Sequence, residues 1–218
     1  GNSFTDSKGN TIRKPSFSKT VTNNVLVEGI SQLDSIVLTN ASVEDIDDLK
    51  ELIQDFSVSE VVVSKNPSEK REDSKWDISV QNHEIGEMEF FSGVKWELIP
   101  ANGNKKEVQN SMFTIQGERI LIVEDKMKTL PDKVDFVIAS KKNAEGIAKI
   151  NGFTQMQTKS LMLEKGNGKV QSHISSRFLE QLEQQVSHIW ISQEDGAVHM
   201  MQEKGVRKFH TIKSHKDE

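Results

Sequence analysis

A group of polar side chains that could bind a cation follows a short apolar run. The run SIVL at 35–38 predicts a strand, and a helix with regularly spaced apolar residues begins near Val43. Four side chains with oxygen atoms lie at this junction: Asn40, Ser42, Glu44 and Asp45. Carboxylate oxygens suit Mg²⁺ or Ca²⁺, so one interpretation is that Glu44 and Asp45, together with Asp125 and His173, form an oxygen-rich metal site. The other is helix capping, with Ser42 at the N-cap and Asp45 three residues later.

The elements that position these residues follow a strand–helix–strand pattern. Apolar residues between Val43 and Phe56 form one stripe at helical spacing, and EVVVS at 60–64 predicts a second strand. Because a helix connects the two strands, they should be parallel. The sequence therefore predicts a βαβ unit and an α/β fold.

The remaining elements are predicted from shorter patterns. The residues around this unit predict a polar arm at 1–28, with a short helix at 25–30 near its end, and a long loop at 65–88. Further strands are predicted at 94–99, 111–116, 119–123, 134–139 and 160–163, and helices at 144–150 and 176–185. The chain is predicted to close with a hairpin between 188–192 and 197–201.

Composition excludes several classes of function. The chain has no cysteine, which excludes disulfides and zinc sites built on thiolates. Its formal net charge of −5 is unlike that of a dedicated nucleic-acid binder, so any contact with nucleic acid must come from local basic patches. No apolar run approaches the roughly 20 residues that cross a bilayer.

A family resemblance rests on segments that occur in a fixed order. These segments are GISQLDSIVLTNASVEDIDDL from Gly29, WELIP from Trp96, QNSMFTI from Gln109, GERILIVED from Gly117, VDFVIASKKN from Val134 and HISSRFLEQLEQQVSHIWISQEDGAV from His173. Together they resemble the metallo-β-lactamase domain of the ComEC competence family, the membrane channels that import single-stranded DNA. The resemblance implies a metallo-β-lactamase-like αββα sandwich of two mixed sheets flanked by helices, without the family's first strands. It implies a domain at 29–203, followed by a basic tail at 204–218.

The resemblance also implies that the metal site is degenerate. Histidine and aspartate ligands in the family hold Zn²⁺ or Mn²⁺, which activates a water for hydrolysis. The family's first ligand cluster falls here on Asn40, Ser42, Glu44 and Asp45. Its later histidine pair falls on Lys141 and Lys142, whose ammonium groups have no lone pair for a metal. Ligand types remain only at Asp125 and His173, so we expect no catalytic metal and no other cofactor.

The two lysines open a locally basic stretch that could contact DNA. It contains Lys141, Lys142, Lys149, Lys159, Lys165 and Lys169. Such a stretch can hold phosphates without regard to sequence, and the alternative is an ordinary solvated surface.

The expected function is a non-catalytic domain of a competence-type DNA-uptake membrane protein, on the extracellular side of the membrane. Its expected partners are DNA and the rest of a membrane-embedded channel in cis. Two alternatives stay open. One is a metal-dependent phosphodiesterase or nuclease whose carboxylate-based site uses Asp125, Glu44 and Asp45 with His173. The other is a structural protein-interaction domain.

Overall fold

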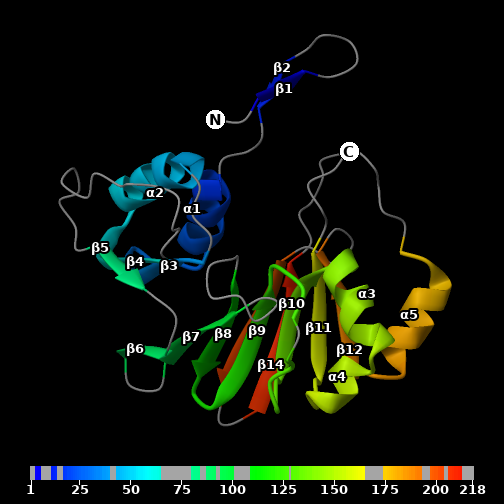
Figure 1. Cartoon of the computed structure of the whole chain (residues 1–218). Helices are drawn as coiled ribbons and strands as arrows, with labels where there is room; N and C mark the ends of the chain where they lie inside the picture. Colours follow the sequence, from blue (N-terminus) through cyan, green and yellow to red (C-terminus); the bar gives the residue numbers. More distant parts are fainter. Residues whose placement is uncertain are drawn as a thin grey trace. The chain divides into compact units, whose positions relative to one another are not determined.

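The computed structural model of this chain forms two compact units, Gly1–Glu84 and Ile85–Glu218 (Figure 1). Each unit is described by itself below. The structure describes residues 3–5, 11–13, 17–39, 43–64, 80–83, 87–91, 94–100, 109–127, 129–164, 174–192, 197–203 and 206–212.

The first unit contains the predicted βαβ motif. Its elements are β1 (Ser3–Thr5), β2 (Thr11–Arg13), α1 (Phe17–Val27), β3 (Gln32–Leu38), α2 (Val43–Asp55), β4 (Ser57–Ser64) and β5 (Val80–His83). Strands β3, β4 and β5 form a parallel sheet in that order, and β1 pairs with β2 in a separate antiparallel ribbon. Leu49 of α2 packs on Val61 and Val63 of β4, and all three are buried. The predicted parallel strand pair and its apolar helix stripe are therefore confirmed.

The start of the first unit differs from the prediction. Helix α1 covers Phe17–Val27, whereas a polar arm with a helix only at 25–30 was predicted. The Ser18 hydroxyl donates a hydrogen bond to Glu51 of α2 at 2.8 Å, and the Thr22 hydroxyl donates to Asp55 at 3.0 Å. Tertiary contacts with α2 thus stabilise a helix whose sequence has weak local signals, and these contacts cannot be identified from local propensity.

The second unit is built on a mixed seven-stranded sheet. Its strands are β6 (Glu87–Phe91), β7 (Val94–Pro100), β8 (Gln109–Ile115), β9 (Glu118–Val123), β10 (Phe136–Ser140), β11 (Ser160–Glu164) and β12 (His188–Ile191), and its helices are α3 (Lys141–Lys149), α4 (Gly152–Gln155) and α5 (Ser176–Glu183). The spatial order is β12-β11-β10-β9-β8-β7-β6. Strands β9 to β12 are parallel to one another, and β6 to β9 form an antiparallel meander.

The core of the second unit lies between the sheet and its helices. Leu121, Val137 and Leu161 from the central strands are fully buried, and they belong to one cluster with Phe153 of α4 and Leu182 of α5. These contacts place the helices on one face of the sheet, as Figure 1 also shows. Across the described helices of the chain, none combines the length and the apolar character that crossing a bilayer requires.

The strands predicted at 111–116 and 119–123 are confirmed, and they form a hairpin. Strands β8 and β9 are joined through Gln116 and Gly117, whose φ angles are 51° and 84°. Two consecutive positive φ values are typical of the type I′ turn. The backbone twist of this turn matches the twist of the two strands that a two-residue loop joins. Strand β6 lies at one edge of this meander, and its first two residues, Glu87 and Met88, fall within the range predicted to be a long loop.

The predicted closing hairpin is wrong. Strand β12 pairs in parallel with β11, and the strand after it, β13 (Ala197–Glu203), pairs instead with β14 (Val206–Ile212). Helix α5 connects β11 to β12, and a helical crossover of this kind returns the chain parallel to its previous strand. Strand β14 lies inside the range that was predicted to be a basic tail.

One buried carboxylate connects strands at the amino end of β10. Asp135 is 3% exposed, and its side chain accepts a hydrogen bond from the Arg119 backbone N–H at 3.1 Å. Its backbone carbonyl accepts from the N–H groups of Lys159 and Ser160, both at 3.2 Å. Asp135 therefore connects the beginnings of β9, β10 and β11.

Candidate functional site

The parallel strands of the second unit end together at one edge of the sheet. Val123, Ala139, Leu163 and Ile191 are in register across β9, β10, β11 and β12. The residues that follow them, with the beginning of antiparallel β8, form what is called here the carboxyl edge. Ligands of open α/β sheets bind outside this kind of edge, and Asp125, Lys141 and Lys142 all lie there.

A buried asparagine supports the end of β9. The Asn110 side-chain oxygen accepts the backbone N–H groups of Glu124 at 2.9 Å and of Asp125 at 3.0 Å. Asn110 is 0% exposed, and its Nδ2 has no hydrogen-bond partner among the described residues. The backbone at Asp125 is thus held in place from the neighbouring strand.

A second asparagine supports the same strand end from the opposite side. The Asn143 Nδ2 group, from α3, donates a hydrogen bond to the Val123 carbonyl at 3.1 Å. Asn110 comes from β8 and Asn143 from the helix after β10, so side-chain amides on both sides fix residues 123–125. Hydrogen bonds of this kind hold a backbone at a strand end, where ladder bonds stop.

Asp125 uses part of its carboxylate within its own loop. Its Oδ1 accepts the Lys126 backbone N–H at 2.7 Å, which is an arrangement typical of a turn. It makes no other side-chain hydrogen bond or ion pair with the residues that the structure describes. Among those residues, no group of three or more histidine, aspartate, glutamate or cysteine side chains is arranged to hold a metal ion.

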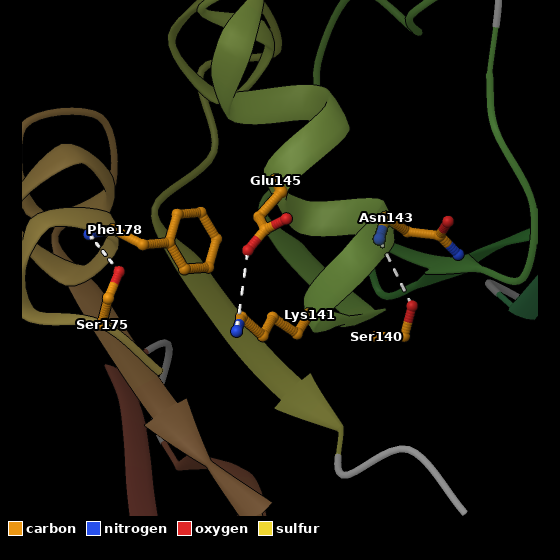
Figure 2. A network of polar contacts seen from close by, with 6 residues as sticks. All are labelled: Ser140, Lys141, Asn143, Glu145, Ser175 and Phe178. Carbon is orange, nitrogen blue, oxygen red and sulfur yellow. Dashed lines mark hydrogen bonds and ion pairs between the residues drawn. The ribbon is translucent and has the colours of Figure 1, made fainter. Parts of the chain in front are cut away.

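The two lysines at the carboxyl edge form the first turn of α3. Ser140 is the N-cap, and its hydroxyl accepts the Asn143 N–H at 3.3 Å. Lys141 is half-buried, and its ammonium lies 3.8 Å from the Glu145 carboxylate one turn later, as Figure 2 shows. Lys142 is exposed. A helix N-terminus carries a partial positive charge, so these ammonium groups stand where a negative charge would be favoured.

The remaining lysines of the predicted basic stretch have different surroundings. Lys149 is exposed in the last turn of α3. The Lys159 ammonium lies 3.5 Å from Asp135 at the opposite edge of the sheet, so it does not belong to the carboxyl edge. Lys165 and Lys169 lie outside the described residues.

An acidic side chain also lies at the carboxyl edge. Glu164 is the last residue of β11, and burial raises the pKa of its carboxyl above the ordinary value of 4.5. The side chain still reaches solvent, so the carboxyl is only partly withdrawn from water.

The other half of the predicted site belongs to the first unit. Glu44 and Asp45 lie in the first turn of α2. Asn40, Ser42 and His173 lie outside the described residues, so the capping role of Ser42 stays a prediction. Of the predicted positions, the structure thus brings Asp125, Lys141 and Lys142 to one edge of the second unit's sheet.

Sequence reasoning gave no role to the two asparagines. Asn110 lies within the segment QNSMFTI, where a polar residue precedes an apolar strand, and Asn143 ends the segment VDFVIASKKN. An uncharged amide carries no metal-ligand or acid–base signal. Its role depends on which strand lies beside it, and the sheet order supplies this information.

Comparison with known proteins supports the fold. No family model matches the chain, and no curated protein matches it in sequence. A solved structure that is similar is Igni18, described as a novel metallo hydrolase from the hyperthermophilic archaeon Ignicoccus hospitalis KIN4/I. The TM-score is 0.52 at 11% identity, with 83% of this chain and 80% of that chain covered. This similarity, with the mixed sheet and its flanking helices, confirms the predicted α/β fold as metallo-β-lactamase-like.

Proposed function

We propose that this chain is a non-catalytic metallo-β-lactamase-like domain that contacts the backbone of DNA without cleaving it. The observation that carries the proposal is the position of Lys141 and Lys142. They begin α3 directly after β10, at the edge where a hydrolase of this fold would need metal ligands.

The positive charges of Lys141 and Lys142 at this edge argue against a catalytic metal cation. Metal-assisted hydrolysis requires several lone-pair donors around one or two ions, with an open position for water. Asp125 is the ligand type retained there, and its Oδ1 is engaged by its own loop. Two ammonium groups nearby would repel a divalent cation, and Lys141 is already paired with Glu145.

The same positive charges favour the binding of phosphate groups. Exposed Lys142 and the positive end of the α3 dipole both attract anions, and exposed Lys149 adds a cation from the other end of α3. Contacts of this kind would be weak and would not depend on base sequence, because they involve only the phosphate backbone of the DNA. The net charge of −5 over the whole chain limits the affinity further.

Catalysis is tested by incubating the chain with single-stranded DNA and with bis(p-nitrophenyl) phosphate in the presence of Mn²⁺, Mg²⁺ or Zn²⁺. The expected result is no cleavage above the rate without protein. Metal-dependent cleavage that disappears in Asp125→Ala would overturn the non-catalytic proposal.

DNA binding is tested by fluorescence anisotropy with a labelled single-stranded oligonucleotide. Binding should weaken in Lys142→Ala and Lys149→Ala, and should fall steeply between about 50 and 200 mM salt. Lys133→Ala is the matched control, because Lys133 is exposed just before β10 at the opposite edge of the sheet. If the three variants bind equally, or if no variant and no wild-type protein binds at low salt, the DNA proposal fails and a protein-interaction role replaces it.

The more specific proposal is that the domain belongs to a competence-type DNA-uptake membrane protein and lies on the extracellular side. The ordered segments that resemble the ComEC family, from Gly29 to Val198, support it. The full-length gene tests it, since the reading frame should encode several membrane spans beside this domain. A reading frame without them would overturn the assignment.

A metal-dependent phosphodiesterase is the second candidate. The similarity to a protein described as a metallo hydrolase favours it, although that likeness extends to the fold alone. Of its ligand types, Asp125 lies at the carboxyl edge, Glu44 and Asp45 lie in the first turn of α2, and His173 lies outside the described residues. The cleavage experiment decides between the two candidates.

A further inference from the structure

One of the two lysines at the carboxyl edge forms an ion pair within its own helix. The Lys141 ammonium lies 3.8 Å from the carboxylate of Glu145, four residues later on α3 (Figure 2). Hydrogen bonds between oppositely charged groups are shorter, at about 2.7 to 2.9 Å, so this pair is an electrostatic contact without a short hydrogen bond. Glu145 thus neutralises a lysine at the helix end where an anion is favoured.

The pair is weak enough to be exchanged for another partner. The Lys141 side chain is 27% exposed and that of Glu145 is 38% exposed, so water reaches both. Exposed pairs at this spacing contribute little to stability, and a lysine that precedes its glutamate is the less favourable order on a helix. A phosphate oxygen can approach the ammonium more closely than the carboxylate does, because the exposed Glu145 side chain is free to turn towards solvent.

We propose that Glu145 competes with phosphate for Lys141 and thereby sets the affinity of the carboxyl edge for DNA. This inference rests on the proposed function, in which Lys142 and Lys149 contact the DNA backbone. Without DNA, Glu145 occupies Lys141. When the backbone binds, Lys141 exchanges the carboxylate for a phosphate group and becomes a third cationic contact, and the loss of the ion pair lowers the net affinity.

The test compares Glu145→Gln with the wild type by fluorescence anisotropy, using a labelled single-stranded oligonucleotide at about 50 mM salt. Glu145→Gln keeps the size of the side chain and should bind about two- to fivefold more tightly, because Lys141 no longer has to leave a carboxylate. Glu183→Gln is the matched control. It makes the same change in net charge at an exposed carboxylate in the last turn of α5, and it should bind as the wild type does.

A double-mutant cycle separates competition for Lys141 from the general loss of a negative charge. Lys141→Met removes the ammonium and keeps an apolar stem, and in this background Glu145→Gln should tighten binding clearly less than it does in the wild type. An equal gain in both backgrounds would overturn the proposal, and so would an unchanged or weaker affinity of Glu145→Gln when the wild type binds DNA. If neither the wild type nor Glu145→Gln binds, the proposed function itself fails, and this inference fails with it.

Discussion

The ends of two neighbouring strands, β9 and β10, differ in the residues that follow them and in the contacts that these residues make. At the end of β9 the structure has an aspartate, Asp125, and a double backbone support, from Asn110 on one side and Asn143 on the other. At the end of β10 two lysines begin a well-capped helix. Backbone support and side-chain chemistry are therefore separable, because the hydrogen bonds that shape the end of β9 come from Asn110 and Asn143 and not from the charged side chains at the edge.

The largest expected effect comes from removing the support of β9. Asn110→Ala should lower the free energy of unfolding by about 2 to 4 kcal/mol, because it leaves two backbone N–H groups without their acceptor in a buried setting. Urea denaturation measures it. Thr114→Ala, on the same strand away from the edge, is the control and should cost clearly less. Equal losses would mean that the asparagine has no special role.

The support from the helix side should matter less. Asn143→Ala should cost about 0.5 to 1.5 kcal/mol, because it removes one hydrogen bond to the Val123 carbonyl from a partly exposed site. The same denaturation measurement, together with the double variant Asn110→Ala/Asn143→Ala, tests whether the two supports are coupled. Additive losses would contradict a shared support of the β9 end.

The end of β10 should respond in the opposite direction. Lys142→Glu should stabilise the protein by about 0.3 to 1 kcal/mol, because it places a negative charge at the N-terminus of α3. Lys149→Glu, in the last turn of the same helix, should destabilise by a similar amount. Thermal unfolding at low salt measures both. If Lys142→Glu is also destabilising, the lysine has a structural role that the proposal does not include.

The smallest expected effect is at Glu164. Burial raises the pKa of its carboxyl in the folded state above the value of 4.5, so the folded state binds the proton more tightly than the unfolded chain does. The stability that this gives is present below pH 4.5 and is lost as the pH rises through the folded-state pKa. Glu164→Gln should therefore be more stable than the wild type at pH 7, by at most about 0.5 kcal/mol for a partly exposed group. Unfolding curves at pH 4 and pH 7 check the sign.

The succession of the central helices and strands along the chain could be predicted from the sequence. The stripe from Val43 to Phe56 and the apolar runs at β3, β4, β9 and β10 have unambiguous periodicity, and each lies where it was predicted. The fold class followed from their alternation. Helix α1 was not predictable, because its formation depends on Glu51 and Asp55, which are each 33 positions away from their partners Ser18 and Thr22.

The candidate site could be predicted only in its charged positions. Lys141 and Lys142 were expected to lie together with Asp125, and one edge of the sheet brings them together. The amides that shape this edge were missed, because Asn110 reaches residues that are 14 and 15 positions away in the sequence. Only the order of the strands shows that these residues are neighbours.

Asp135 has a consequence for how this fold can change over time. It joins the beginnings of β9, β10 and β11 through its carboxylate and its backbone carbonyl, at the edge opposite the lysines. When hydrogen bonds join the strands of a sheet at one edge, the other edge can accept different residues. The strand order and register do not depend on the residues at that other edge. Different side chains after β10 would then change the chemistry of that edge with little cost in fold, and the same freedom would allow new binding properties to arise there.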